Sequence, residues 1–205
     1  MTGPGPVAAP LSRPAGSAGV VGSLPGVDER CDGCGFRFDD VPLAELPDRL
    51  RRLASRYTSR LTRLADRDRS EDLLRSPAGP GGRSVLDLAE EVLAILRRTR
   101  IRLAGTLAGE LSDHVLGDGP VDPGAVADGA GPAELAQALA RACDDLAHAV
   151  EHLGPEDWTR TILLRGEDPQ ERTLAWVGRE SLHQGEHRLE DIDLVLRTVN
   201  PPGPG

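Results

Sequence analysis

The stretch SVLDLAEEVLAILRRTRIRL, residues 84–103, carries apolar side chains along one side at steps of three and four residues. This spacing matches the 3.6-residue turn of an α-helix and predicts an amphipathic helix with one buried side. Ser84 is a suitable N-cap for this helix, and Asp87 three residues later supports a start there. The predicted buried line is Leu88, Val92, Ile95, Thr99 and Leu103.

Three other stretches, 47–66, 132–154 and 173–199, show the same periodicity. The stretch between the last two, 157–172, is compatible with a short extended segment or a hairpin-like excursion. Aromatic residues make up only 2% of the chain, so the core must be aliphatic, which suits helices packed on helices. The sequence therefore predicts an all-α fold, a four-helix bundle.

The two ends of the chain differ in composition from its middle. Residues 1–29 are rich in Gly, Pro, Ala and Ser and predict a disordered arm, and residues 199–205 predict a frayed tail. The helical domain is expected over 30–198. Within it, the Gly-, Pro- and Asp-rich segment 117–132 predicts a long loop.

The overall charge and hydropathy exclude several classes of partner. A formal net charge of -9 argues against a nucleic-acid-binding protein. No apolar run reaches about 18 residues, so no membrane span is expected. The N-terminus lacks the pattern of a signal peptide, and an odd count of three cysteines suits a reducing compartment, so we expect a cytoplasmic protein.

Two histidine pairs have the spacing of four residues that places both imidazoles on one side of a helix. His148 and His152 fall on the polar face of their helix, so solvent exposure is the simpler interpretation. His183 and His187 fall near Trp176, which indicates a partly buried surface. This second pair is the candidate for metal binding, although two solvated histidines would give the same spacing.

A metal site on His183 and His187 needs a third ligand from another helix. Glu91 lies at the edge of the apolar face of its helix and is the candidate. Glu180 and Asp191 are placed to orient the imidazoles from behind. Two histidines and one carboxylate would suit a divalent ion such as Zn²⁺, Ni²⁺, Mn²⁺ or Fe²⁺.

Cys31 and Cys34, in CDGCGF, have the spacing of half a zinc knuckle. A complete site needs two further ligands, for which His114 or a second copy of the chain are candidates. A redox-active dithiol is a second interpretation, and a segment without a catalytic part is a third. Cys143 falls on an apolar helix line and is expected to be a buried core residue.

Three segments resemble the DinB-like superfamily, which includes mycothiol-dependent maleylpyruvate isomerases and related thiol transferases. RSVLDLAEEVLAILRR, residues 83–98, is similar to the family's second helix. DWTRT and RTLAWVGRESLHQGEHRLEDI, which together span residues 157–192, are similar to the region that carries its H-x-x-x-H motif and trailing Asp. CDGCGFRFDD, residues 31–40, resembles an N-terminal extension of some actinobacterial relatives.

The resemblance implies a four-helix bundle with a divalent metal held by three histidines, two of which correspond to His183 and His187. The third histidine falls at Glu91 and the usual tryptophan at Arg83, and both are departures. In this family the metal activates a low-molecular-weight thiol, such as mycothiol, for attack on a small electrophile. A lysine-free composition fits an actinobacterial source. The alternative is a non-catalytic bundle that has lost part of the metal site and serves binding or homodimerisation.

Overall fold

The structure is a computed structural model that describes residues 30–65, 74–109, 130–164 and 169–199. The predicted N-terminal arm 1–29 lies outside these residues. So do His114, most of the predicted loop 117–132, and residues 200–205 of the predicted tail. Helix α6 ends at Val199, where the sequence predicts the end of its last helix.

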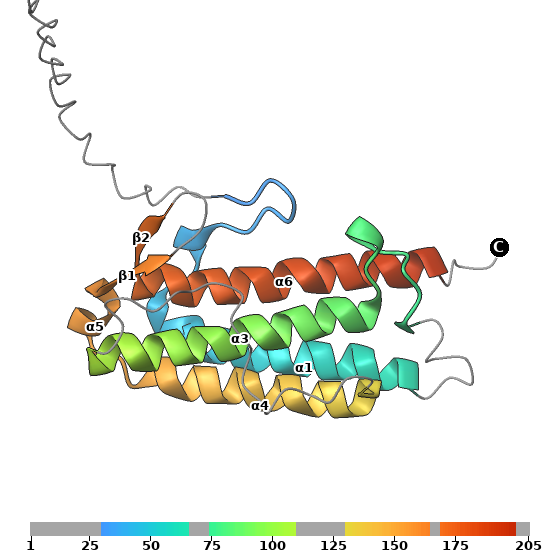
Figure 1. Cartoon of the computed structure of the whole chain (residues 1–205), viewed down its shortest axis with the longest axis horizontal. Coiled ribbons are helices and arrows are strands. Elements are labelled where there is room, and N and C mark those ends of the chain that lie inside the picture. The colour runs from blue at the N-terminus through green and yellow to red at the C-terminus, as the bar shows by residue number, and fades with distance from the viewer. Residues whose placement is uncertain (1–29, 66–73, 110–129, 165–168, 200–205) are drawn as a thin grey trace, which may run out of the picture.

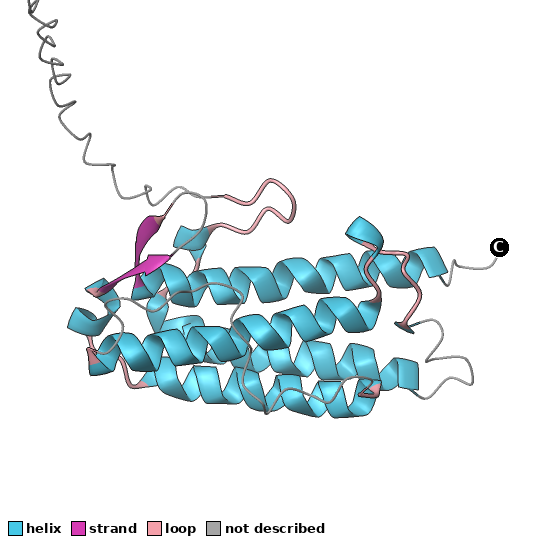
Figure 2. Cartoon of the chain, viewed as in Figure 1, coloured by secondary structure: helices cyan, strands magenta, loops and turns pink. Residues whose placement is uncertain are grey.

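Four long helices account for most of the described residues, as Figure 2 shows. They are α1 (Leu46–Ala65), α3 (Val85–Ala108), α4 (Pro132–Glu151) and α6 (Leu174–Val199). They lie side by side with their long axes roughly aligned (Figure 1). Helix α1 packs against α4 and α6, and α3 packs against the same two helices. The chain is therefore mostly helical, as predicted.

Short elements join the long helices. Helix α5 (Pro155–Thr159) is followed by β1 (Thr161–Leu164) and β2 (Gln170–Thr173), which pair antiparallel with Thr161 opposite Thr173. This two-stranded sheet is the hairpin-like excursion that the sequence allows, and it is a departure from a purely helical fold. Three short 3-10 helices complete the described part: Phe38–Asp40, Leu43–Glu45 and Pro80–Gly82.

The predicted helix starts agree with the local hydrogen bonds. Ser84 Oγ accepts from the backbone N–H of Asp87 at 3.1 Å, and the Asp87 carboxylate accepts from the N–H of Ser84 at 2.8 Å. These two bonds form a capping box. Thr173 Oγ1 accepts from the N–H of Trp176 at 3.2 Å, so α6 begins where the sequence predicts.

The core is aliphatic and follows the predicted lines. Leu88, Val92, Thr99 and Leu103 of α3 are buried, whereas Ile95 is half-buried. Cys143 is fully buried among them, as expected of a small apolar residue. The remaining fully buried large side chains include Leu46, Leu50, Leu53, Tyr57, Leu61, Leu135 and Leu139.

Two glycines let α6 approach α1 closely. A Cβ atom added at Gly185 would lie 2.3 Å from Leu53 Cδ2, and one at Gly178 would lie 2.9 Å from Leu46 Cδ2. The buried hydroxyl of Tyr57 donates to the carbonyl oxygen of Gly185 at 2.9 Å. The stretch of α6 that carries His183 and His187 is thus fixed against α1 on one side.

Residues 30–41 cross the outer side of α6 (Figure 1). The Arg179 guanidinium donates to the carbonyl oxygen of Val41 at 2.9 Å, and Phe38 stacks on Trp176 with ring centroids 5.8 Å apart. Phe36, Phe38 and Val41 are buried. The N-terminal segment with the two cysteines therefore packs on the helix that carries the histidine pair.

Candidate metal centre

The cysteines lie in a tight turn that opens the described part of the chain. The N–H of Cys31 donates to the carbonyl oxygen of Phe36 at 2.9 Å, and the N–H of Gly35 donates to that of Cys31 at 2.7 Å. Gly35 has a φ of 71°, a left-handed conformation that glycine adopts without a steric penalty. This turn holds both sulfurs on the side that faces α6.

Aromatic contacts fix the turn over the histidines. The Phe36 ring lies 5.0 Å from the His183 ring, and the Phe38 ring lies 5.5 Å from it, measured between centroids. The two phenylalanine rings contact each other edge to face at 5.4 Å. His183 is therefore covered by an apolar lid, and its residue exposure is only 8%.

The structure brings together residues that the sequence assigns to two separate sites. One ligand atom from each of Cys31, Cys34, His183 and His187 lies within 4.8 Å of the others. A Cβ atom at position 33 would lie 2.7 Å from His187 Cε1, so Gly33 lets the cysteine turn approach α6 this closely. Two sulfurs and two imidazoles form the donor set that could hold a metal ion.

His183 has the hydrogen-bonding arrangement of a metal ligand. Its Nδ1 lies 3.0 Å from Glu180 Oε2, so one ring nitrogen is paired with a carboxylate. Its Nε2 is buried and has no hydrogen-bond partner among the described residues. An unpaired buried ring nitrogen is costly, and a bound cation would satisfy it. A carboxylate behind a ligating histidine is the usual way to fix the ring.

His187 is held less tightly than His183. Its Nδ1 lies 3.5 Å from Cys31 Sγ, and its Nε2 lies 4.0 Å from Asp191 Oδ2. The carboxylates expected behind the two rings, Glu180 and Asp191, are therefore both in place, with Asp191 beyond hydrogen-bond distance. His187 is half-buried, so the metal centre opens to solvent on this side.

The pKa values of the two thiols are shifted in opposite directions from the usual value of a cysteine. Burial raises the pKa of Cys31, but backbone hydrogen bonds at Cys34 and Gly33 and the nearby His183 side chain outweigh it and lower this pKa to about 6. Burial and the neighbouring Cys31 raise the pKa of Cys34 to about 11. A hydrogen bond from the Phe36 backbone lowers this pKa, but by less. A cation between the two sulfurs would offset their mutual repulsion, because a coordinating thiol is deprotonated.

Glu91, the third ligand expected from the sequence, is not part of this group. Arg188 Nε and Nη2 donate to its two carboxylate oxygens at 3.1 and 3.0 Å. Arg83 Nη1 also donates to Glu91 Oε2. Both oxygens are thus occupied by guanidinium groups. The two positions at which the chain departs from the resembled family, Arg83 and Glu91, form an ion pair with each other.

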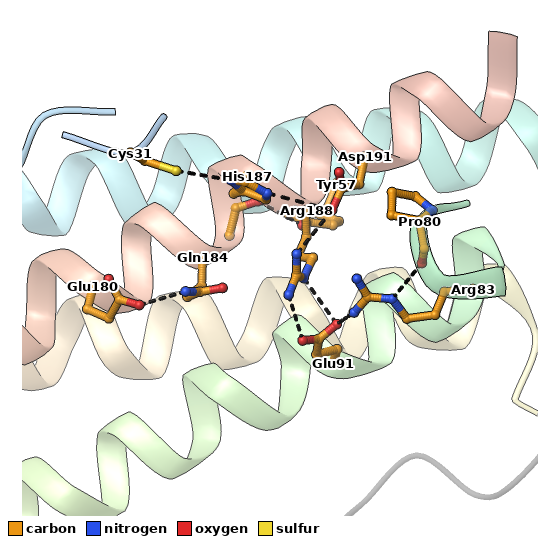
Figure 3. A network of polar contacts seen from close by, with 11 residues as sticks. Cys31, Tyr57, Pro80, Arg83, Glu91, Glu180, Gln184, His187, Arg188 and Asp191 are labelled. Atoms are coloured by element: carbon orange, nitrogen blue, oxygen red, sulfur yellow. Dashed lines mark hydrogen bonds and ion pairs between the residues drawn. The ribbon is translucent and has the colours of Figure 1, made fainter. Parts of the chain in front are cut away.

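Figure 3 shows how α6 separates the two groups. Cys31 lies beside His187. Arg188, which follows His187 in the chain, points the other way and contacts Glu91 on α3. Arg188 Nη1 also donates to Asp191 at 3.1 Å. Burial lowers the pKa of Arg188, but its bonds to Glu91 and Asp191 outweigh burial and raise it. The network ties α3 to α6 beside the metal centre.

Replacing Glu91 tests whether it binds metal or only braces Arg188. We expect Glu91→Gln to retain the full metal content, because neither oxygen faces the sulfurs or imidazoles. The free energy of unfolding should fall by about 1 kcal/mol, since the pair is only partly buried. Elemental analysis and urea unfolding measure the two quantities. Loss of the metal in this variant would assign Glu91 to the metal shell.

The other sequence candidates lie away from the centre. His148 and His152 are exposed on α4, with ring centroids 4.4 Å apart, as expected of a solvated pair. Cys143 is buried in the core, and burial raises the pKa of its thiol to about 12. His114 falls outside the described residues.

Comparison of the chain with protein-family models, with curated proteins and with solved structures gives no match. Among the described helices, none combines the length and apolar character needed to cross a membrane. The functional assignment therefore depends on the geometry of the site.

Proposed function

We propose that this chain is a zinc-binding helical protein in which Cys31, Cys34, His183 and His187 hold one ion. The observation that supports this proposal is that two sulfurs and two imidazole nitrogens lie within 4.8 Å of one another. Zn²⁺ favours a tetrahedral shell of this composition, whereas Mn²⁺ prefers oxygen ligands. The ion would fasten the N-terminal segment to α6.

A shell of four protein ligands favours a structural role over catalysis. Catalytic zinc sites keep one position open for water or substrate, whereas structural sites are closed. The apolar cover of Phe36 and Phe38 over His183 also suits a stabilising ion. We therefore favour the non-catalytic interpretation, in which the metal completes the fold of a binding or interaction module.

The proposed architecture is a four-helix bundle of the DinB-like kind. The packing of α1 and α3 against both α4 and α6 supports this topology. Because Glu91 pairs with Arg83, helix α3 supplies no metal ligand in this proposal. In this proposal the cysteine turn supplies the ligands that the helix lacks.

A thiol-dependent transferase or isomerase is the second candidate. The observation in its favour is that both cysteines and His187 are only partly buried. A low-molecular-weight thiol such as mycothiol would then replace one protein ligand and attack a small electrophile. Visible absorption of the cobalt-substituted protein separates the two functions. An unchanged thiolate band on addition of thiol supports the closed site, and a changed band supports the transferase.

Metal content tests the zinc proposal directly. Untagged protein purified without chelator is expected to carry about one zinc per chain. Cys31→Ser and His183→Ala should each lower the zinc content severalfold, because removal of one of four ligands leaves an incomplete shell. Inductively coupled plasma mass spectrometry of the dialysed proteins measures the stoichiometry.

The second histidine pair provides a matched control. His148→Ala with His152→Ala removes two imidazoles at the same spacing, but from the exposed face of α4. This double variant should keep its zinc. Equal losses in the control and the ligand variants, or metal-free wild-type protein with intact cysteines, would overturn the proposal.

A further inference from the structure

Three buried polar atoms outside the metal centre lack a hydrogen-bond partner among the described residues. They are Arg102 Nε, Thr106 Oγ1 and Arg172 Nε. Arg102 and Thr106 lie one turn apart on α3, so they belong to the same side of that helix. Buried donors are normally paired, and each exception calls for an explanation. Of the three residues, Arg102 lines a cavity, and its Nε lacks an acceptor among the described residues.

Arg102 lines a cavity of about 190 Å³ between α3, β1 and α6. The apolar part of its wall consists of Ile95, Leu164, Trp176 and Val177. The Arg172 guanidinium lies over the Trp176 ring, 5.0 Å from its centroid. At ~30 Å³ per molecule, the cavity has room for about six waters. Its size and lining suit a small organic molecule with one polar end.

The charge of Arg102 is not balanced by the side chains described around it. Burial lowers the pKa of its guanidinium, and the neighbouring Arg98 lowers it further. The one carboxylate in the cavity wall, Glu180, is already engaged: Oε2 pairs with His183 and Oε1 accepts from Gln184 at 2.6 Å. A partly buried cation without an anion is unfavourable.

We propose that this cavity binds a small organic monocarboxylate. The carboxylate would accept from Arg102, and the apolar body would pack against Leu164, Trp176 and Val177. A singly charged ligand fits better than a dianionic phosphate, because Glu180 lies in the same wall and would repel a second negative charge. None of the four proposed metal ligands lines this cavity, and Glu180 links the two sites because it lines the cavity and pairs with His183.

Tryptophan fluorescence gives a readout confined to this cavity. The chain has two tryptophans, so Trp158→Phe leaves Trp176 as the only tryptophan, and excitation at about 295 nm avoids the single tyrosine. Cyclohexanecarboxylate is expected to change the Trp176 emission in a saturable manner. Cyclohexylmethanol, a neutral molecule of similar shape, should bind about tenfold more weakly because it loses the charged hydrogen bond. Stronger binding of inorganic phosphate, or equal binding of the alcohol, would refute the monocarboxylate.

Variants of α3 locate the charge that is recognised. In the Trp158→Phe background, Arg102→Gln should weaken cyclohexanecarboxylate binding about tenfold or more. Arg97→Gln removes an arginine of the same helix that lines a different cavity, and binding should not change. Equal affinity in Arg102→Gln contradicts the proposal. Because the comparison of acid with alcohol uses no Arg102 variant, misfolding of Arg102→Gln cannot mask the result.

The same titration distinguishes this proposal from the zinc proposal. Repeating it on Cys31→Ser protein tests ligand binding in a chain that lacks one proposed metal ligand. If the Cys31→Ser protein still binds the carboxylate and the wild-type protein contains no zinc, the carboxylate proposal is supported and the zinc proposal is refuted. The reverse outcome, bound zinc and no response of Trp176, would refute the cavity alone.

Discussion

Removing the metal with a strong chelator is expected to lower the midpoint of thermal unfolding by about 8–16 °C. An ion that binds only the folded chain, at a free concentration about 1,000 times its Kd, contributes about 4 kcal/mol. For a chain of this size each kcal/mol shifts the midpoint by about 2–4 °C. Far-UV circular dichroism should record the earlier transition with little loss of helix signal at low temperature, since the aliphatic core does not include the metal.

The loss should be concentrated at the N-terminal segment. Residues 30–41 supply two of the four proposed metal ligands, and they contact α6 through the two phenylalanines and the bond from Arg179 to Val41. Trypsin should cut after Arg37 in chelated protein and spare this bond in loaded protein, because a protease needs local unfolding. Mass spectrometry of the fragments identifies the cut.

The Cys31→Ser, Cys34→Ser double variant is the control for this experiment. Without its sulfurs the chain has no ion to lose, so chelator should change neither its unfolding midpoint nor its digestion pattern. An equal effect of chelator on wild-type and double-variant protein would trace the destabilisation to another cause. Unchanged wild-type protein would mean that no ion fastens the segment.

The helices were predictable because their signals are local. Periodic leucines at 84–103, the Ser84 cap and the Thr173 cap each depend on residues within a turn of one another, and the structure has all three. The hairpin at 161–173 was less certain, because short strands carry too few residues to show a period.

The metal centre was predictable only in halves. Cys31 with Cys34 and His183 with His187 each show ligand spacing, and each pair needs at least one ligand from elsewhere. Two incomplete ligand pairs in one chain can complete each other, and this was the signal in the sequence that they form one site. About 150 residues separate the halves, and no local pattern places the cysteine turn on α6. The placement comes from Phe36 and Phe38 packing on His183 and Trp176, which is a tertiary effect.

The expectation that Glu91 binds metal followed from its position on the helix. Such a position indicates which way a side chain points, but not which group it meets there. Arg188 also faces this space from α6, and a guanidinium pairs with a carboxylate through two parallel bonds. Three hydrogen bonds from guanidinium groups already reach the two Glu91 oxygens, which leaves little acceptor capacity for a metal ion. The arginines occupy it, so the site geometry favours sulfur over oxygen in the metal shell.

Gly185→Val is expected to destabilise the protein by about 3 kcal/mol, at the upper end of the range for overpacked cores. Even one added carbon at Gly185 would lie 2.3 Å from Leu53 Cδ2, and Leu53 is fully buried with no open space to move into. Valine adds two further carbons and is a weaker helix former than alanine. The unfolding midpoint should fall by about 6–12 °C.

A double-mutant cycle with Leu53→Ala isolates the steric origin of this effect. Leu53→Ala alone should cost about 2–5 kcal/mol, because it leaves a cavity between α1 and α6. In that background Gly185→Val should cost far less than in the wild type, since the valine fills the space that the leucine leaves. Urea unfolding of the four proteins gives the coupling free energy. Additive costs would mean that the clash with Leu53 is not the origin of the effect.

Because Gly185 lies between the proposed ligands His183 and His187 on α6, zinc content should fall in Gly185→Val and recover in the double variant. Zinc content that does not change in Gly185→Val would mean that the close approach of α6 to α1 does not position the proposed metal centre.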